Sequence, residues 1–143
     1  QNTEIHSAIF YGFTVIDTNQ LVENVGGDEK LARDMIYNTM HLIAENKEGA
    51  NKSRTAPFTR AQTMFASMTD QMPFSLAEGY RDPVQPQLRD AMDRMDAHLG
   101  QLDNNYGVHD DRAFMSLDER SFRNLGTRMR FQELSEWARG AVG

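Results

Sequence analysis

The chain has 143 residues, a length that fits one domain with a sizeable core, and we expect residues 1–143 to form a single helical domain. Cysteine is absent, which excludes disulfides, thiol nucleophiles and thiolate metal sites, and no apolar run approaches the roughly 20 residues of a membrane span. The formal net charge of -6 argues against a general affinity for nucleic acid.

The first residues leave two local structures open. Apolar side chains recur at helical spacing over residues 4–13, whereas a short strand from Phe10 to Ile16 is the alternative. The chain begins with Gln1 rather than Met, and we therefore expect it to be processed or excised from a longer one.

Two helices are predicted next, each with a polar residue at its start. Asp17 or the residue after it can cap a short helix through Val25, which the pair Gly26–Gly27 stops. Asp28 then caps the clearest helix of the chain, about residues 29–48, whose Leu, Met and Ile side chains form an amphipathic stripe.

The middle of the chain predicts two more helices, separated by an irregular connector. Pro57 suits a first helical position, and Ala, Met and Phe side chains at helical spacing continue that helix to residue 72. Residues 73–86 contain three prolines and predict the connector. A helix over about 84–104 follows, and Gly107 ends it.

The last helical region is expected to begin at Ser116, where the sequence SLDE predicts a capping box with Glu119. Apolar residues in 117–129 lie nearly opposite those that follow Arg130 on one helix, so a straight helix cannot bury both sets against one neighbour. We therefore expect a kink or break near residues 126–130. The predicted fold class is all-α, a compact bundle of five or six helices.

A narrow apolar seam with a period of 3.5 residues runs along the predicted 84–104 helix. Its members are Leu88, Met92, Met95, Leu99, Leu102 and Tyr106. Such a seam is typical of a helix packed against one other helix, and the sequence leaves open whether that helix belongs to the same chain. We expect Phe131, Leu134 and Trp137 to dock on a neighbouring subunit, so both groups are predicted as a partner interface.

Four C-terminal arginines form a candidate contact row. On one continuous helix they would lie within about a quarter-turn of one another. The row comprises Arg112, Arg120, Arg123 and Arg130. It can form ion pairs within the chain or with an acidic patch of a partner, such as residues 90–111 of another subunit, or it can neutralise phosphates of a nucleic acid. An internal or intersubunit ion-pair role is the preferred interpretation and nucleic-acid contact the alternative.

No catalytic or metal-binding constellation is found in the sequence. Asp90, Asp93 and Asp96 repeat every three residues, but Asp90 can pair with Arg94, and acidic helix faces are ordinarily solvated. The four histidines lie far apart, and no nucleophilic serine motif accompanies them. We therefore expect no enzyme activity, no catalytic residue, no metal and no cofactor.

These features favour a non-enzymatic helical subunit that acts through protein contacts in a larger homo- or hetero-oligomeric assembly. The expected type is a viral, phage or secretion complex. One alternative is a nucleic-acid-contacting subunit that uses the arginine row, and another is a helical bundle that holds a small ligand between methionine-lined helices. Neither composition nor motifs indicate a compartment.

Overall fold

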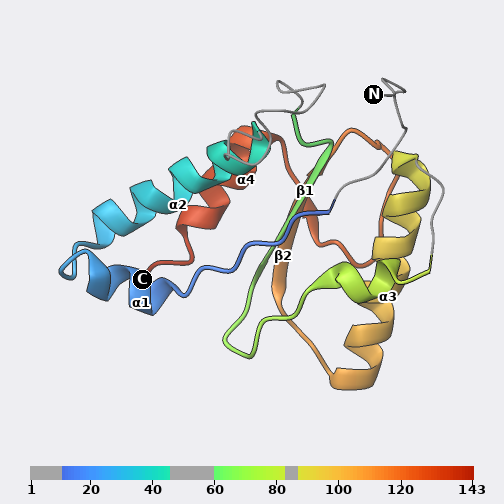
Figure 1. The fold of residues 1–143 in the computed structure, drawn as a ribbon, viewed down its shortest axis with the longest axis horizontal. Helices are drawn as coiled ribbons and strands as arrows, with labels where there is room; N and C mark the ends of the chain where they lie inside the picture. The colour runs from blue at the N-terminus through green and yellow to red at the C-terminus, as the bar shows by residue number, and fades with distance from the viewer. Residues whose placement is uncertain (1–10, 46–59, 83–86) are drawn as a thin grey trace, which may run out of the picture.

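The computed structural model describes residues 11–45, 60–82 and 87–143, which form three layers (Figure 1). In chain order the elements are α1 (Thr18–Asn24), α2 (Glu29–Ala44), β1 (Thr63–Met68), the 3-10 helix η2 (Leu76–Tyr80), α3 (Leu88–Tyr106), β2 (Asp111–Ser116), β3 (Thr127–Arg128) and α4 (Phe131–Arg139). The all-α expectation is wrong, because a mixed three-stranded sheet separates α2 and α4 from α3. In these ranges no helix is long and apolar enough to cross a membrane.

The sheet has the order β1-β2-β3, with an antiparallel and a parallel pairing. Phe65 lies opposite Phe114 and both face α3, whereas Met64 and Ala113 face α2 and α4. Burial of both faces removes the polar–apolar alternation that identifies a strand in a sequence. For this reason residues 57–72, predicted as a helix, contain β1 instead.

The seam of α3 packs inside the chain. Its most buried members belong to one cluster, which comprises Leu76, Met92, Leu99, Phe114 and Leu125. Three further seam residues, Leu88, Met95 and Leu102, are partly buried against this cluster, whereas Tyr106 is 77% exposed. The surface that covers the seam is therefore the sheet with η2 and the adjoining loops, and not a second α-helix.

The opposite face of the sheet is covered by α2 and α4. Leu134 is fully buried in a cluster with Ala44, Met64 and Ala113. Phe131 and Trp137 pack against the same cluster. The structure thus places all three predicted docking residues of α4 against elements of their own chain.

Residues 117–130 form no helix, so the predicted helix over 117–129 is wrong. The Ser116 hydroxyl accepts a hydrogen bond from the backbone N–H of Asp118 and forms a turn instead of a helix cap. Gly126 has φ +83°, and a Cβ at this position would lie 2.0 Å from the carbonyl oxygen of Arg112. The chain therefore passes directly against β2 at Gly126, and in place of the expected kink residues 126–130 contain β3 and the residues that lead into α4.

The start signals of α1 and α2 and the stop signal of α3 are confirmed, whereas α2 ends at Ala44 and not near the predicted residue 48. The carboxylates of Asp17 and Asp28 accept hydrogen bonds from the backbone N–H groups of Gln20 and Leu31. Gly107 ends α3 in the left-handed conformation with φ +63°. The helix expected over 4–13 falls mostly outside the described residues, and the strand alternative forms no regular element over 11–16.

Candidate nucleic-acid interface

The strand register brings several arginines to one end of the sheet. The backbone N–H of Leu117 donates to the carbonyl oxygen of Gln62, so Arg60 lies at the end where β2 finishes. Because β3 runs parallel to β2, Arg128 and Arg130 approach this same end. Residues that are 50 or more positions apart in sequence are therefore neighbours here.

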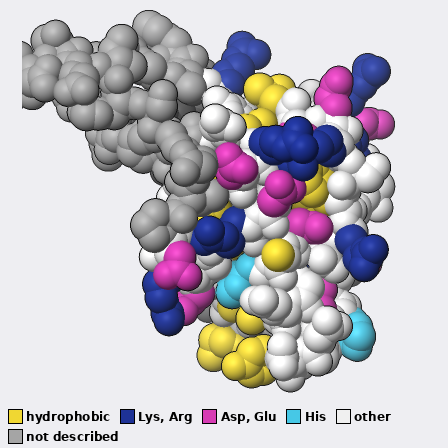
Figure 2. Space-filling model, turned by 90° about the vertical axis from the view of Figure 1, so that its right-hand side faces the viewer, with side chains coloured by type: hydrophobic (Ala, Val, Ile, Leu, Met, Phe, Trp, Pro, Cys, Tyr) yellow, Lys and Arg dark blue, Asp and Glu magenta, His cyan; other side chains and the backbone are white. Residues whose placement is uncertain are grey.

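The beginning of α3 lies at this end as well. The Arg120 guanidinium donates to the carbonyl oxygen of Arg89 at 3.1 Å and pairs with Asp93 at 3.0 Å. We call the arginines of this region the basic end: Arg60, Arg89, Arg120, Arg128 and Arg130. On the α3 side of the molecule, Lys and Arg side chains lie among acidic ones toward the end where α3 begins, and hydrophobic and His side chains lie at the other end (Figure 2).

Arg120 is occupied by contacts within the loop and with α3. Its Nη2 lies 2.7 Å from Oδ2 of Asp118, and its guanidinium carbon lies 5.4 Å from the centroid of the Phe122 ring. The hydrogen bond from Arg120 lowers the pKa of the Asp118 carboxyl, and the same bond raises the pKa of the guanidinium. Both groups are therefore charged at neutral pH, and Arg120 has few donors left for a phosphate.

Arg128 holds the loop in its non-helical conformation. Its guanidinium donates to the carbonyl oxygens of Ser116, Asp118 and Arg120 at 3.1, 2.7 and 2.7 Å. It also lies over the Phe114 ring, 4.8 Å from the centroid. The Arg128 guanidinium thus provides hydrogen bonds to backbone carbonyl groups, which would have accepted backbone N–H groups if these residues had formed the predicted helix.

Arg112 is buried away from the basic end. Its guanidinium, in a side chain that is 6% exposed, bonds both carboxylate oxygens of Asp103 at 2.6 and 2.7 Å and the carbonyl oxygen of Asn124 at 3.2 Å. Arg123 is exposed within the loop. The predicted helical row is consequently not formed: its four members occupy β2, two loop positions and the residue before α4.

Three arginines of the basic end, Arg60, Arg89 and Arg130, are exposed, and none makes an ion pair within the described part of the chain. Exposed guanidiniums that form no ion pair are suited to phosphate binding. Sequence reasoning found only Arg130 of these three. The apolar run that follows Arg60 was the available signal, because a strand there would bring Arg60 beside the end of its pairing strand.

Two of the aspartates that repeat every three residues on α3 contact the loop after β2. Asp93 pairs with Arg120, and the Asp96 carboxylate accepts the backbone N–H of Asn124 at 2.8 Å. Within the ranges that the structure describes, no group of three His, Asp or Glu side chains is placed to hold a metal ion.

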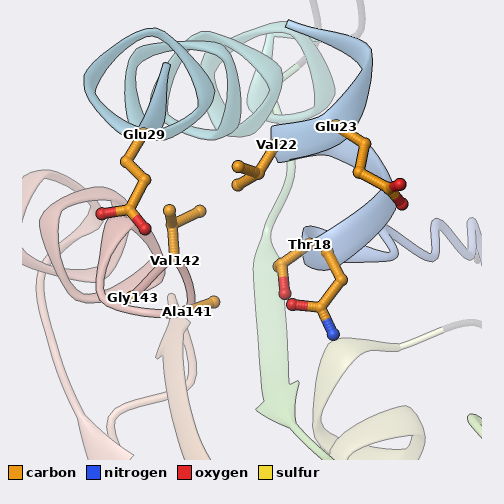
Figure 3. A pocket seen from close by; sticks show the side chains of 8 residues that line it. Thr18, Val22, Glu23, Glu29, Ala141, Val142 and Gly143 are labelled. Carbon is orange, nitrogen blue, oxygen red and sulfur yellow. The ribbon is translucent and has the colours of Figure 1, made fainter. Parts of the chain in front are cut away.

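A pocket of about 530 Å³ lies between α1, the start of α2 and the C-terminal residues (Figure 3). Val22 and Val142 lie on opposite sides of it, and Glu23 and Glu29 belong to its lining. Its described lining has neither a methionine nor a basic side chain. The pocket therefore differs from the methionine-lined site expected of a ligand-sensing bundle, and its carboxylates disfavour an anion.

Comparisons with known proteins place this architecture in context. The family model of CT1975-like proteins (Cas_CT1975) matches residues 1–138. A chain of a "CRISPR RNA-guided surveillance complex, pre-nicking" has a TM-score of 0.77 and 16% identity, over 90% of this chain and 36% of that one. A chain of a second "CRISPR RNA-guided surveillance complex" has a TM-score of 0.76 and 17% identity, over 88% of this chain and 50% of that one. This chain thus spans half or less of their lengths, and no curated protein sequence is significantly similar to it.

Proposed function

The chain belongs to the family of CT1975-like proteins, and on that premise we propose that it is a subunit of a CRISPR RNA-guided surveillance complex whose basic end contacts the guide RNA. The family match over residues 1–138 is the observation that carries the proposal. It also overturns the expected viral, phage or secretion-type assembly and the small-ligand sensor.

The geometry of the basic end supports RNA contact. The guanidiniums of Arg60, Arg89 and Arg130 are exposed beside a loop that Arg120 and Arg128 hold in place. A preorganised loop loses little conformational freedom on binding, so more of the phosphate attraction remains as affinity. In this role the chain binds RNA and neighbouring proteins, and we assign no reaction step to it.

Charge reversal at single sites tests the proposal. Arg60→Glu, Arg89→Glu and Arg130→Glu are each expected to weaken binding of single-stranded guide RNA by about fourfold or more at 0.15 M salt, because each removes a phosphate contact. Fluorescence anisotropy measures the affinity, and circular dichroism verifies the fold.

Lys30→Glu is the matched control. It changes the net charge by the same amount on α2, where the Lys30 side chain is 82% exposed. We expect RNA binding by this variant to equal that of the wild type. Equal weakening by Lys30→Glu and the arginine variants would mean that net charge alone matters, and unchanged binding in all four would contradict the basic end as the RNA contact.

A further inference from the structure

The three exposed arginines of the basic end lie on segments that are far apart in the sequence but bond to one short stretch, Ser116–Arg120. The carbonyl oxygen of Gln62, two residues after Arg60, accepts the backbone N–H of Leu117 at 2.9 Å. Arg128, two residues before the last exposed arginine, donates to three carbonyl oxygens of the same stretch. We call Ser116–Arg120 the junction segment, because it joins the segments that bear these arginines.

The start of α3 is joined to the junction segment by the side chain of Arg120. Its Nη2 donates to the carbonyl oxygen of Arg89 at 3.1 Å, and its Nη1 lies 3.0 Å from Oδ1 of Asp93. The bond to Asp93 is the stronger of these two, because both of its groups are charged. The position of Arg89 relative to the other exposed arginines therefore depends on the Asp93 carboxylate.

Asp93 has two opposite effects on an RNA bound at the basic end. Its side chain is 56% exposed, so its negative charge repels the phosphates that the neighbouring guanidiniums attract. Its bond to Arg120 acts the other way, because arginines that already have a fixed spacing lose less conformational freedom on binding. Removal of this carboxylate therefore shows by its sign which effect is larger.

We propose that Asp93 is a positioning residue for the RNA contact, which fixes Arg120 to α3 and thereby sets the spacing of the exposed arginines. Arg120 transmits this position and does not itself bind a phosphate, because its guanidinium is bonded to Asp93, to Asp118 and to the carbonyl oxygen of Arg89. The inference rests on the proposed function and adds to it an acidic residue that increases the affinity for RNA.

Asp93→Asn is the direct test. An exposed ion pair contributes little to stability, so the variant is expected to fold, and circular dichroism verifies this. Electrostatics alone would raise its affinity for single-stranded guide RNA, whereas loss of positioning should lower the affinity by about fivefold. Fluorescence anisotropy at 0.15 M salt measures the change.

Asp90→Asn is the matched control. It removes the same charge from the same helix, and the side chain of Asp90 makes no ion pair within the described ranges. We expect this variant to bind RNA at least as tightly as the wild type does, because it removes repulsion without removing a positioning contact.

Arg120→Gln distinguishes positioning from phosphate contact. If Arg120 only positions the other arginines, the affinity should fall about fivefold, while the slope of the logarithm of the binding constant against the logarithm of salt concentration stays unchanged. A phosphate contact by Arg120 itself would make this slope less steep by about 0.7 in the variant.

Two results would overturn the inference alone. They are binding by Asp93→Asn that is as tight as binding by Asp90→Asn, and a less steep salt slope for Arg120→Gln, in either case with weakened binding by the charge reversals at the exposed arginines. Unchanged binding in those charge reversals would instead contradict the proposed function, and this inference with it.

Discussion

At the scale of single residues, the pair of Asp118 and Arg120 makes the loop after β2 sensitive to acid. The hydrogen bond from Arg120 lowers the pKa of Asp118 below its ordinary value of 3.8. A carboxyl whose pKa is lower in the folded state stabilises the fold above the unfolded-state pKa, and this contribution is lost as the pH falls through the folded-state pKa.

We therefore expect Asp118→Asn to lower the stability of the protein at pH 7. Its free energy of unfolding should also change less than that of the wild type as the pH falls below 3.8. Urea unfolding between pH 7 and pH 2 measures both effects. Parallel curves for the two proteins in the acid range would show that Asp118 makes no such contribution.

Gly107 and Gly126 both have left-handed backbone, and only Gly126 is also crowded. Comparing alanine substitutions at the two positions therefore distinguishes the cost of the backbone conformation from the cost of steric overlap. Gly107 has φ +63° and open space around it, whereas Gly126 has φ +83° and lies against the Arg112 backbone. Gly107→Ala should cost roughly 1–2 kcal/mol for the left-handed conformation alone. Gly126→Ala should cost clearly more, because the β2 backbone cannot yield as a flexible side chain can. Thermal unfolding compares them, and equal losses would contradict the close approach.

At the scale of elements, the α3 seam permits a test of where the helix packs. Leu99→Ala should lower the free energy of unfolding by about 2–5 kcal/mol, because Leu99 is fully buried and its truncation leaves a cavity. Tyr106→Ala, in the same seam but 77% exposed, should change it by no more than about 0.5 kcal/mol. Chemical denaturation of the monomer measures both, and similar losses at the two positions would contradict packing within the chain.

Elements whose signals are local could be predicted from the sequence. Asp17, Asp28 and Gly107 each act within one helical turn, and α1, α2 and α3 form where these residues indicate. The strands could not be recognised, because Met64 and Phe65 are apolar neighbours that face opposite buried layers. Such a run has no period of two, and its methionines and alanines favour a helix equally well.

At the scale of the whole molecule, the candidate site depends on contacts between distant parts of the chain. Arg60 reaches the basic end only through the pairing of Gln62 with Leu117, and Arg89 only through the packing of α3 beside the loop. Because the sequence predicted helices over residues 57–72 and 117–129, neither of these contacts could be predicted. The predicted arginine row also included Arg112, although the Asp103 carboxylate holds Arg112 inside the fold.

The same arrangement predicts how RNA binding depends on salt. The chain has a net charge of -6, so any attraction for RNA is local to the exposed guanidiniums and not a property of the whole surface. If Arg60, Arg89 and Arg130 each neutralise one phosphate of a single strand, the logarithm of the binding constant should fall with the logarithm of salt concentration with a slope of about -2. Each single charge reversal should make that slope less steep by about 0.7, whereas Lys30→Glu should not change it.

Anisotropy titrations at a series of salt concentrations measure the slope. A slope near zero would exclude phosphate contact at the basic end, and one much steeper than -2 would mean that other cations of the chain bind most of the RNA.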